Sequence, residues 1–388
     1  MIAEGLPDWL IPSAVRSLSA VYEHMESSAS YETKRRLITV VTDRLLAGYS
    51  VQSVLFDENG DLTVRLTSLL PPPEWSVRLV MPKLPDPVSD WFSSDTSGIV
   101  SEAESIMSGV PLEALSWGDS DIKSAVEGIC GSRLPGWRTS IVVRSASGDD
   151  AALEISFVPE QPLVLAVTHN ISSASMPVML HSRLKGDLLK GFSPLIGLPV
   201  PWVERHREDV AILAKGIVNG DSVMDYAKTE TDATIKTDVI SEVDIDVESK
   251  RYAAWAWMAA YAGRNINPPE VGIHLGRRAQ LLPHWDMELY GELILLTDGW
   301  SAEPRLGLRW SPWGDFWAGG EWSGKDETWW LRVSVDARIH KPYAWMRFGE
   351  YGELNGAVGY RINSFMSIEA HYDSRNDDNW SIRAIVNM

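Results

Sequence analysis

One short segment places a serine, a histidine and two carboxylates at spacings that catalysis uses. In FMSIEAHYD, residues 365–373, the polar positions are Ser367, Glu369, His371 and Asp373. If this segment is a β-strand, the four side chains share one face, because successive side chains of a strand alternate between faces. A serine, a histidine base and an acid that orients the histidine are the parts of a hydrolytic site. His371, Ser367 and Asp373 are therefore candidates for a hydrolytic site.

The rest of the sequence adds little support for catalysis. It contains no GxGxxG, P-loop, CxxC, HExxH or GxSxG motif. His340 and His371 have no third ligand that the sequence can name, so neither a metal nor a cofactor is predicted. The alternative is that these polar residues belong to a network of charges that fills an enclosed space and makes it rigid. We favour this alternative over a catalytic role.

The elements that would position these residues are strands. From Arg251 onward, segments of strand character recur roughly every 10–14 residues, with turn sequences between them. They are YAAWAWMAAYAG, EVGIHLGRR, WDMELYGELILL, PRLGLRW, FWAGGEW, WWLRVSVDARIH, YAWMRFGEY, GAVGYRIN, FMSIEAHYD and WSIRAIVNM. This makes ten strands, or eight if the first two, which are less regular, are not counted.

Apolar and polar residues alternate along several of these strands. In WWLRVSVDARIH, residues 329–340, Leu331 and Val333 alternate with Arg332, Ser334 and Asp336. A soluble sandwich or barrel would bury the apolar face in its core. A transmembrane barrel would turn the same face to lipid and the charged face to its lumen. Alternation alone does not decide between the two.

Three further features favour the transmembrane barrel. Twelve of the 18 tryptophans lie after residue 250, many near strand ends, as in the aromatic girdles of membrane barrels. Arginine outnumbers lysine by 12 to 2 from Arg251 onward, and the planar guanidinium suits an enclosed network of carboxylates. Strands of about 9–11 residues match a bilayer crossing. The predicted interface aromatics are Trp310, Trp313, Trp317, Trp329 and Trp330.

The sequence therefore predicts an antiparallel transmembrane β-barrel of eight to ten strands over residues 251–388. The polar faces of its strands would meet in a narrow lumen. The residues predicted to form a lumenal charge network are Glu288, Glu292, Arg309, Arg332, Asp336, Arg338, Arg347, Glu369, His371, Asp373 and Arg383.

The first 250 residues show three rounds of helices and strands. The second round, 73–161, and the third, 162–250, each have the order strand, helix, helix, strand, strand. The first round, 1–72, has the last four of these pieces. Recurrence at this length predicts a tandem array of small α+β domains.

This order resembles polypeptide-transport-associated domains, known as POTRA domains. The resemblance is carried by LPGWRTSIVV, ALEISFVPEQP and PLVLAVTHNISS, in which Gly136 and Glu160 occupy the family's turn glycine and the acidic end of its third strand. POTRA-like units ahead of a barrel resemble the outer-membrane assembly and two-partner-secretion transporter family. The resemblance implies periplasmic domains that bind unfolded or partner proteins, with a barrel in the outer membrane.

The sequence also departs from that family. The predicted barrel is about half as long as the family's barrels, and the chain ends in Met388, where the family has an aromatic residue. A barrel of eight to ten strands is filled by side chains, so passage of a polypeptide through it is not expected. Anchoring, or edge-to-edge pairing with a second copy as a homo-oligomer, is compatible with this size.

Charge and composition narrow the partners. The formal net charge is −18, and residues from Arg251 onward hold 14 Lys+Arg and 17 Asp+Glu, so the first 250 residues are the acidic part. This argues against nucleic acid, which binds basic surfaces. The single cysteine, Cys130, excludes an internal disulfide and is predicted to be a core residue. No signal peptide is visible in MIAEGLPDWLIP, so export would require that one was removed.

Together these observations predict a scaffold anchored in the bacterial outer membrane, with its acidic N-terminal domains in the periplasm. The expected partners are outer-membrane lipid and a protein bound by the POTRA-like domains, in outer-membrane biogenesis or protein assembly. Two rival functions remain. One is an outer-membrane enzyme that modifies lipid, and the other is a secreted, tryptophan-rich protein that binds carbohydrate.

Overall fold

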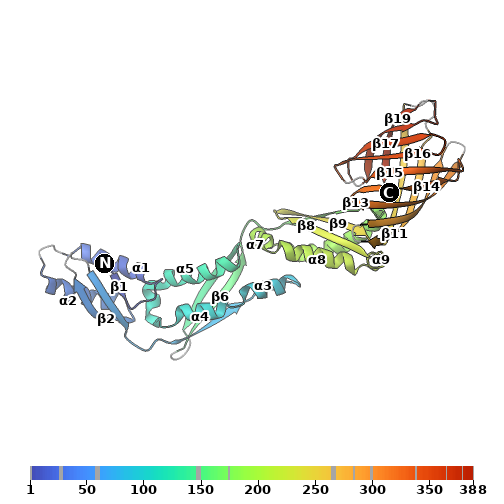
Figure 1. Ribbon diagram of the computed structural model, residues 1–388. Coiled ribbons are helices and arrows are strands. Elements are labelled where there is room, and N and C mark those ends of the chain that lie inside the picture. The colour runs from blue at the N-terminus through green and yellow to red at the C-terminus, as the bar shows by residue number, and fades with distance from the viewer. Residues whose placement is uncertain are drawn as a thin grey trace. The chain divides into compact units, whose positions relative to one another are not determined.

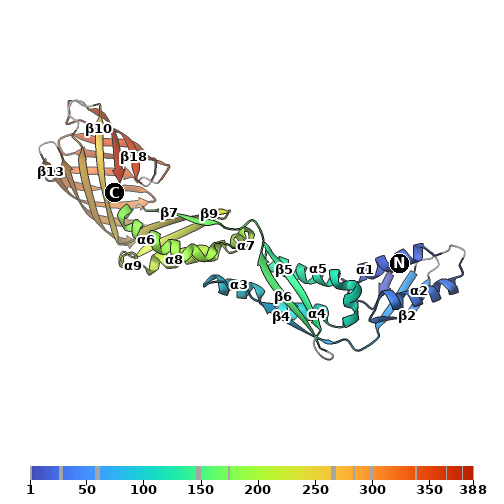
Figure 2. The ribbon, with the colours of Figure 1, turned by 180° about the vertical axis from the view of Figure 1, so that it is seen from behind.

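The computed structural model describes residues 2–25, 29–56, 62–145, 150–173, 175–263, 268–282, 285–297, 300–336, 339–363, 365–377 and 379–387. The chain divides into two compact units, Met1–Val164 with Pro194–Val203, and Leu165–Ser193 with Glu204–Met388. Figure 1 shows small sheets lined by helices in the N-terminal part and a barrel in the C-terminal part. Figure 2 shows the same elements from behind.

The first sheet has the order β1-β3-β2, with β1 (Ile2–Glu4), β2 (Tyr49–Phe56) and β3 (Leu62–Ser68). Its helices are α1 (Ile11–Glu23) and α2 (Tyr31–Leu45). Strand β1 pairs in parallel with β3 and was not predicted, because three residues are too short to show an alternating pattern. The first round therefore also begins with a strand, as the other two do.

The second sheet has the order β4-β6-β5, with β4 (Glu74–Val80), β5 (Trp137–Ser145) and β6 (Asp150–Pro159). Helices α3 (Val88–Thr96), α4 (Ile99–Met107) and α5 (Leu115–Arg133) and the short turn η1 (Leu112–Ala114) lie between β4 and β5. Cys130 of α5 is fully buried, as predicted, and burial raises the pKa of its thiol to about 11.

The segment Pro194–Val203 packs into this second core. Trp202 is fully buried, with its ring centroid 6.1 Å from that of Trp137, and its indole N–H donates to Asp95 at 2.8 Å. Gly136, the turn glycine of the resemblance, has φ +80°, and a Cβ there would lie 2.7 Å from Pro199. Its carbonyl accepts the backbone N–H of Glu160 at 2.9 Å. Only glycine satisfies both the backbone angle and the close approach.

The third sheet has the order β7-β9-β8, with β7 (Ala166–Ser172), β8 (Thr229–Lys236) and β9 (Ile240–Ser249). Its helical elements are α6 (Val178–Phe192), η2 (Ser193–Leu195), α7 (Val200–Arg205), α8 (Arg207–Gly220) and α9 (Ser222–Tyr226). Residues 222–226 form the short helix α9, and β8 begins only at Thr229. The Asp221 carboxylate accepts the N–H groups of Val223 and Met224 and thereby starts α9.

All three sheets place their third strand in the centre, parallel to the first and antiparallel to the second. The α+β expectation is therefore confirmed. The division into domains at residues 72, 161 and 250 stays a prediction. Within the described part of the chain, no helix combines the length and the apolar character needed to cross a bilayer.

The C-terminal region is a closed antiparallel barrel of ten strands, which confirms the larger of the two predicted counts. The strands are β10 (Tyr252–Ala262), β11 (Glu270–Leu282), β12 (Trp285–Leu296), β13 (Ser301–Trp313), β14 (Phe316–Ser323), β15 (Thr328–Val335), β16 (Pro342–Gly349), β17 (Leu354–Arg361), β18 (Met366–Asp373) and β19 (Trp380–Asn387). Each pairs with the next, and β10 pairs with β19 to close the barrel. We call the end where β10 begins proximal and the opposite end distal.

Candidate functional site

The barrel exposes its apolar face and buries its charged face. Leu289 is 64% exposed and Leu331 is 55% exposed, whereas Glu288 and Arg347 are 0% exposed. Other large apolar side chains exposed on the outer face are Ile273, Leu275, Leu306, Leu308, Val358, Ile368, Ile382 and Val386. In a water-soluble globular protein, the leucines would be buried and the charged side chains would be exposed. The outer surface is therefore a continuous apolar belt around a polar interior.

Exposed aromatic residues border this belt at both ends. The proximal ones include Trp285, Trp310, Trp313 and Tyr360, and the distal ones include Trp300, Trp329, Tyr351 and Trp380. Trp310, Trp313 and Trp329, three of the predicted interface aromatics, are among these exposed residues, and their place at a membrane interface stays a prediction. Two aromatic rings of residues around an apolar belt are typical of membrane barrels.

Trp317 and Trp330 correct the predicted set of interface aromatics, because both face the lumen. They are 5% and 2% exposed. The Arg309 guanidinium lies 4.5 Å from the ring centroid of Trp317, and the Arg347 guanidinium lies 4.5 Å from that of Trp330. The physical reason is the two-residue period of a strand: Trp329 and Trp330 are adjacent, so only one of them can face outward.

The first cluster of lumenal charges surrounds His274 of β11. Its Nε2 lies 2.6 Å from Glu288, and its Nδ1 lies 2.9 Å from Glu292. Arg309 binds Glu288 at 2.9 Å, and Arg332 binds Glu292 at 2.8 Å. His274 was missed in the sequence, although its alternation with the outward Ile273 and Leu275 would have placed it inside.

A second cluster joins β13, β14 and β16. Arg347 lies 2.6 Å from Glu321, at an angle that makes an ion pair rather than a hydrogen bond. The Tyr290 hydroxyl donates to the same Glu321 carboxylate at 2.8 Å, and Arg305 binds Glu303 at 2.6 Å. Sequence reasoning missed Glu303, Arg305 and Glu321. All three occupy alternate strand positions whose side chains face the lumen, as the predicted lumenal residues do.

A third cluster spans the closure between the first and last strands. Arg383 of β19 binds Glu369 of β18 at 2.7 Å and Glu270 of β11 at 2.8 Å. The hydroxyl of Tyr261, on the intervening β10, donates to Glu270 at 2.8 Å, and that of Tyr343 donates to Glu369 at 2.7 Å. Side chains therefore reinforce the strand pairing that closes the barrel.

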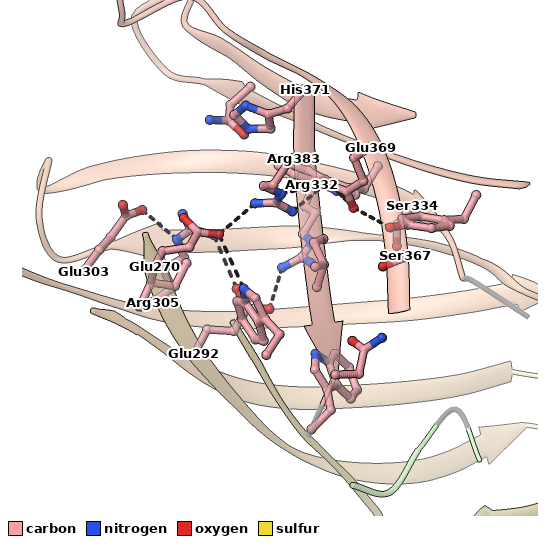
Figure 3. Close-up of a pocket in the computed structure, with 18 of the residues that line it drawn as sticks. Glu270, Glu292, Glu303, Arg305, Arg332, Ser334, Ser367, Glu369, His371 and Arg383 are labelled. Carbon is pink, nitrogen blue, oxygen red and sulfur yellow. Dashed lines mark hydrogen bonds and ion pairs between the residues drawn. The ribbon is translucent and has the colours of Figure 1, made fainter. Parts of the chain in front are cut away.

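These clusters surround a cavity of about 610 Å³. Figure 3 shows Glu270, Glu292, Arg332, Glu369 and Arg383 converging on it from different strands. Met176 and Pro177, which precede α6, border the cavity at the proximal side, and Asp326 and Asn376 border it at the distal side. A space of this size suits water or a small molecule. It is too small for an unfolded chain.

The segment after β15 holds two further predicted lumenal residues, Asp336 and Arg338, and also His340. Asp336 follows β15 and lies 3.8 Å from Arg309. Arg338 lies outside the described residues. His340 is in a turn with φ +59°, and its N–H donates to the carbonyl of Arg361 at 2.9 Å. The segment predicted as one strand to residue 340 thus ends as a strand at Val335.

The structure does not assemble the predicted serine, histidine and acid. Ser367 and His371 are four residues apart on β18, which separates them by roughly 13 Å along the strand. The histidine instead lies 3.5 Å from Ser381 of β19, and Asp373 binds Arg375 at 3.0 Å. Among the described residues, no three His, Cys, Asp or Glu side chains are grouped so that they could hold a metal ion.

No protein-family model and no curated protein sequence matches the chain. Solved structures that match include POTRA domains 3–5 of BamA from Haemophilus influenzae, with 14% identity and a TM-score of 0.17, over 58% of this chain and 82% of that chain. CdiB from Acinetobacter baumannii matches with 10% identity and a TM-score of 0.20, over 94% and 62%. The N-terminal domain of Omp85 from Thermosynechococcus elongatus matches with 10% identity and a TM-score of 0.20, over 64% and 94%. The chain thus spans less than two thirds of the length of CdiB.

Proposed function

We propose that the barrel anchors the chain in the outer membrane and that the acidic α+β domains act in the periplasm as a scaffold for a protein partner. The observation that carries the proposal is the sidedness of the barrel. Leu289 and Leu331 are more than half exposed on its outer face, while Glu288 and Arg347 are fully buried inside. A hydrocarbon solvent outside the barrel accounts for both facts.

The lumenal contacts support anchoring rather than transport. The ten strands close on themselves, and ion pairs connect strands that are not neighbours, β12 with β15 and β14 with β16, inside the lumen. The cavity of about 610 Å³ has the size of a small-molecule site rather than that of a polypeptide channel. Recognition of a protein partner therefore falls to the N-terminal domains, which also hold most of the negative charge.

The same geometry weighs against the two rival functions. Trp317 and Trp330 stack on arginines inside the barrel, so they offer no open platform for a sugar. Ser367 is not near His371, and Asp373 is engaged by Arg375, so the predicted hydrolytic group has no assembled form. Outer-membrane biogenesis or protein assembly remains the function that fits the barrel and the domains best.

Membrane fractionation tests the anchoring. The full chain should sediment with outer membrane, resist extraction by carbonate and require detergent. The unheated protein should also migrate faster in gel electrophoresis than the boiled protein, because a closed barrel stays compact in detergent. Complete release by carbonate would overturn the proposal.

Crosslinking in intact cells tests the scaffold. A photoreactive residue replaces Ile212, which is 66% exposed on α8, or Leu289, which is 64% exposed on the barrel. We expect a protein adduct from position 212 and none from position 289, where lipid is the neighbour. A self-adduct would identify a second copy as the partner. No adduct from position 212 or from comparable exposed positions of the other two sheets would contradict a scaffold function.

A further inference from the structure

At the proximal end, the third sheet's helix α9 touches the outer face of the barrel wall. The ring of Tyr226, the last residue of α9, stacks on that of Tyr252, the first residue of β10, with centroids 5.8 Å apart and planes 14° apart. Their hydroxyl oxygens are 3.4 Å apart. Tyr252 faces outward, because its neighbour Ala253 is buried on the lumenal side. Tyr226 is 66% exposed, so the pair lies at the outer rim.

Two arginines flank this tyrosine pair. Arg251 directly precedes Tyr252, and Arg277 of β11 is opposite Tyr252 in the strand register. The hydrogen bond with Tyr252 raises the pKa of Tyr226, and the positive charges of Arg251 and Arg277 oppose this shift. Both guanidinium groups are therefore within electrostatic range of the Tyr226 hydroxyl.

The surroundings of Arg277 place it at the edge of the apolar belt. It follows Ile273 and Leu275 on the outward face of β11, and these are 45% and 63% exposed. The next residue, Arg278, faces the lumen and binds the buried Glu288 at 3.3 Å. Among the described residues, neither Arg251 nor Arg277 has a carboxylate partner.

Other nearby cations are already neutralised. Lys228 binds Asp225 at 3.1 Å, and Lys250 binds Glu230 at 3.0 Å. Arg251 and Arg277 are thus the charges available for an external anion at this rim. Such an anion would have an apolar surface on one side and water on the other, which is the position of a phospholipid headgroup.

We propose that Arg251, Arg277, Tyr226 and Tyr252 bind the phosphate of an anionic phospholipid in the leaflet next to the third sheet. Guanidinium groups bind phosphate oxygens through paired N–H donors, and the tyrosine hydroxyls supply further donors. The acyl chains would lie along Leu275 and Ile273. This inference rests on the proposed membrane anchoring, and it adds a link that holds α9 against the membrane surface.

Native mass spectrometry of the full chain in detergent tests the site, with phosphatidylglycerol and phosphatidylcholine as probes. We expect the wild type to bind phosphatidylglycerol more tightly than phosphatidylcholine. In the variant Arg251→Gln/Arg277→Gln, the affinity for phosphatidylglycerol should fall by about 25-fold, from about fivefold for each arginine. The matched control is Arg78→Gln/Arg138→Gln, two exposed arginines of the second sheet, and it should bind as the wild type does.

Two further measurements separate the possible outcomes. The site would be overturned if the control lost as much affinity for phosphatidylglycerol as the Arg251/Arg277 variant does. It would also be overturned if that variant lost no affinity. Competition by inorganic phosphate at the same concentration as the lipid would show a site for free phosphate and overturn the lipid assignment. Gel migration of unheated samples reports barrel folding separately, so loss of the lipid site with intact carbonate resistance would leave the proposed anchoring in place.

Discussion

Strands β9 and β18 have nearly the same alternating pattern, but the structure buries opposite halves of it. In β9, Val243 and Ile245 are buried, and Glu242 and Asp244 are exposed. In β18, Glu369 is buried and Ile368 is 46% exposed. The difference shows that alternation specifies two faces, while the surrounding solvent specifies which one is covered.

The largest effect is expected from a charge placed in the buried half of β9. Ile245→Asp puts an unpaired carboxylate into the core of the third sheet, at a cost of more than about 4 kcal/mol, enough to unfold this sheet. Limited proteolysis of membranes should show new cleavage between residues 165 and 250. The control Asp244→Asn, on the exposed face, should leave the pattern unchanged. If Ile245→Asp resisted proteolysis as well as the wild type does, the apolar face of β9 would not form a buried core.

A somewhat smaller effect is expected from breaking one lumenal ion pair. Arg347→Met leaves the Glu321 carboxylate buried without its nearest cation, and the free energy of unfolding should fall by roughly 3–5 kcal/mol. The double variant Arg347→Met/Glu321→Leu removes both charges and should recover most of this loss. Urea unfolding in liposomes measures it. Equal stability of the single variant and the wild type would mean that the lumen is open to bulk water.

The lipid face offers a matched pair of substitutions. Leu289→Arg in the barrel should cost about 2–4 kcal/mol in liposomes, because it places a cation in hydrocarbon. Ile212→Arg on α8 changes a side chain of nearly the same exposure, 66% against 64%, and should change stability by less than about 0.5 kcal/mol. If both substitutions were equally tolerated, water rather than lipid would surround the barrel.

The smallest effect is expected at an exposed ion pair. Lys215 lies 3.0 Å from Asp232, and its hydrogen bond and charge lower the pKa of that carboxyl. A lowered pKa means that the pair stabilises the fold above the ordinary carboxyl pKa and that this stability is lost as the pH falls below it. Thermal unfolding of wild type and Asp232→Asn should differ slightly at pH 7 and converge as the pH falls through the lowered pKa of Asp232. A difference that grows at low pH would contradict this assignment.

The barrel could be predicted because its signals are local. Turn sequences and period-two alternation predicted eight or ten strands, and the two-residue period of a strand placed Glu369, Arg347 and Glu288 on one side of the wall. The same rule, applied to every strand, would have found His274 and Glu321 and would have separated Trp329 from Trp330. These residues were assigned from their chemical type, whereas their alternating position along the strand decides which face they occupy.

Other features depend on contacts between distant segments. Helix α9 is five residues long and starts at the Asp221 cap, so it leaves no periodic signal. Its stacking of Tyr226 on Tyr252 joins residues from the third sheet and the barrel, and no spacing in the sequence indicates it. The contact of Trp202 with the second core is of the same kind.

The sequence by itself determined which residues share a face, where the chain turns, and that the charges of the last 138 residues nearly balance. Those properties follow from backbone geometry and composition. Only the tertiary structure decided that β10 closes on β19, that His371 faces Ser381 rather than Ser367, and that Arg277 points outward while Arg278 binds Glu288. The reason is that each of these depends on strand register and on closure, which bring together residues as far apart as Glu270 and Arg383.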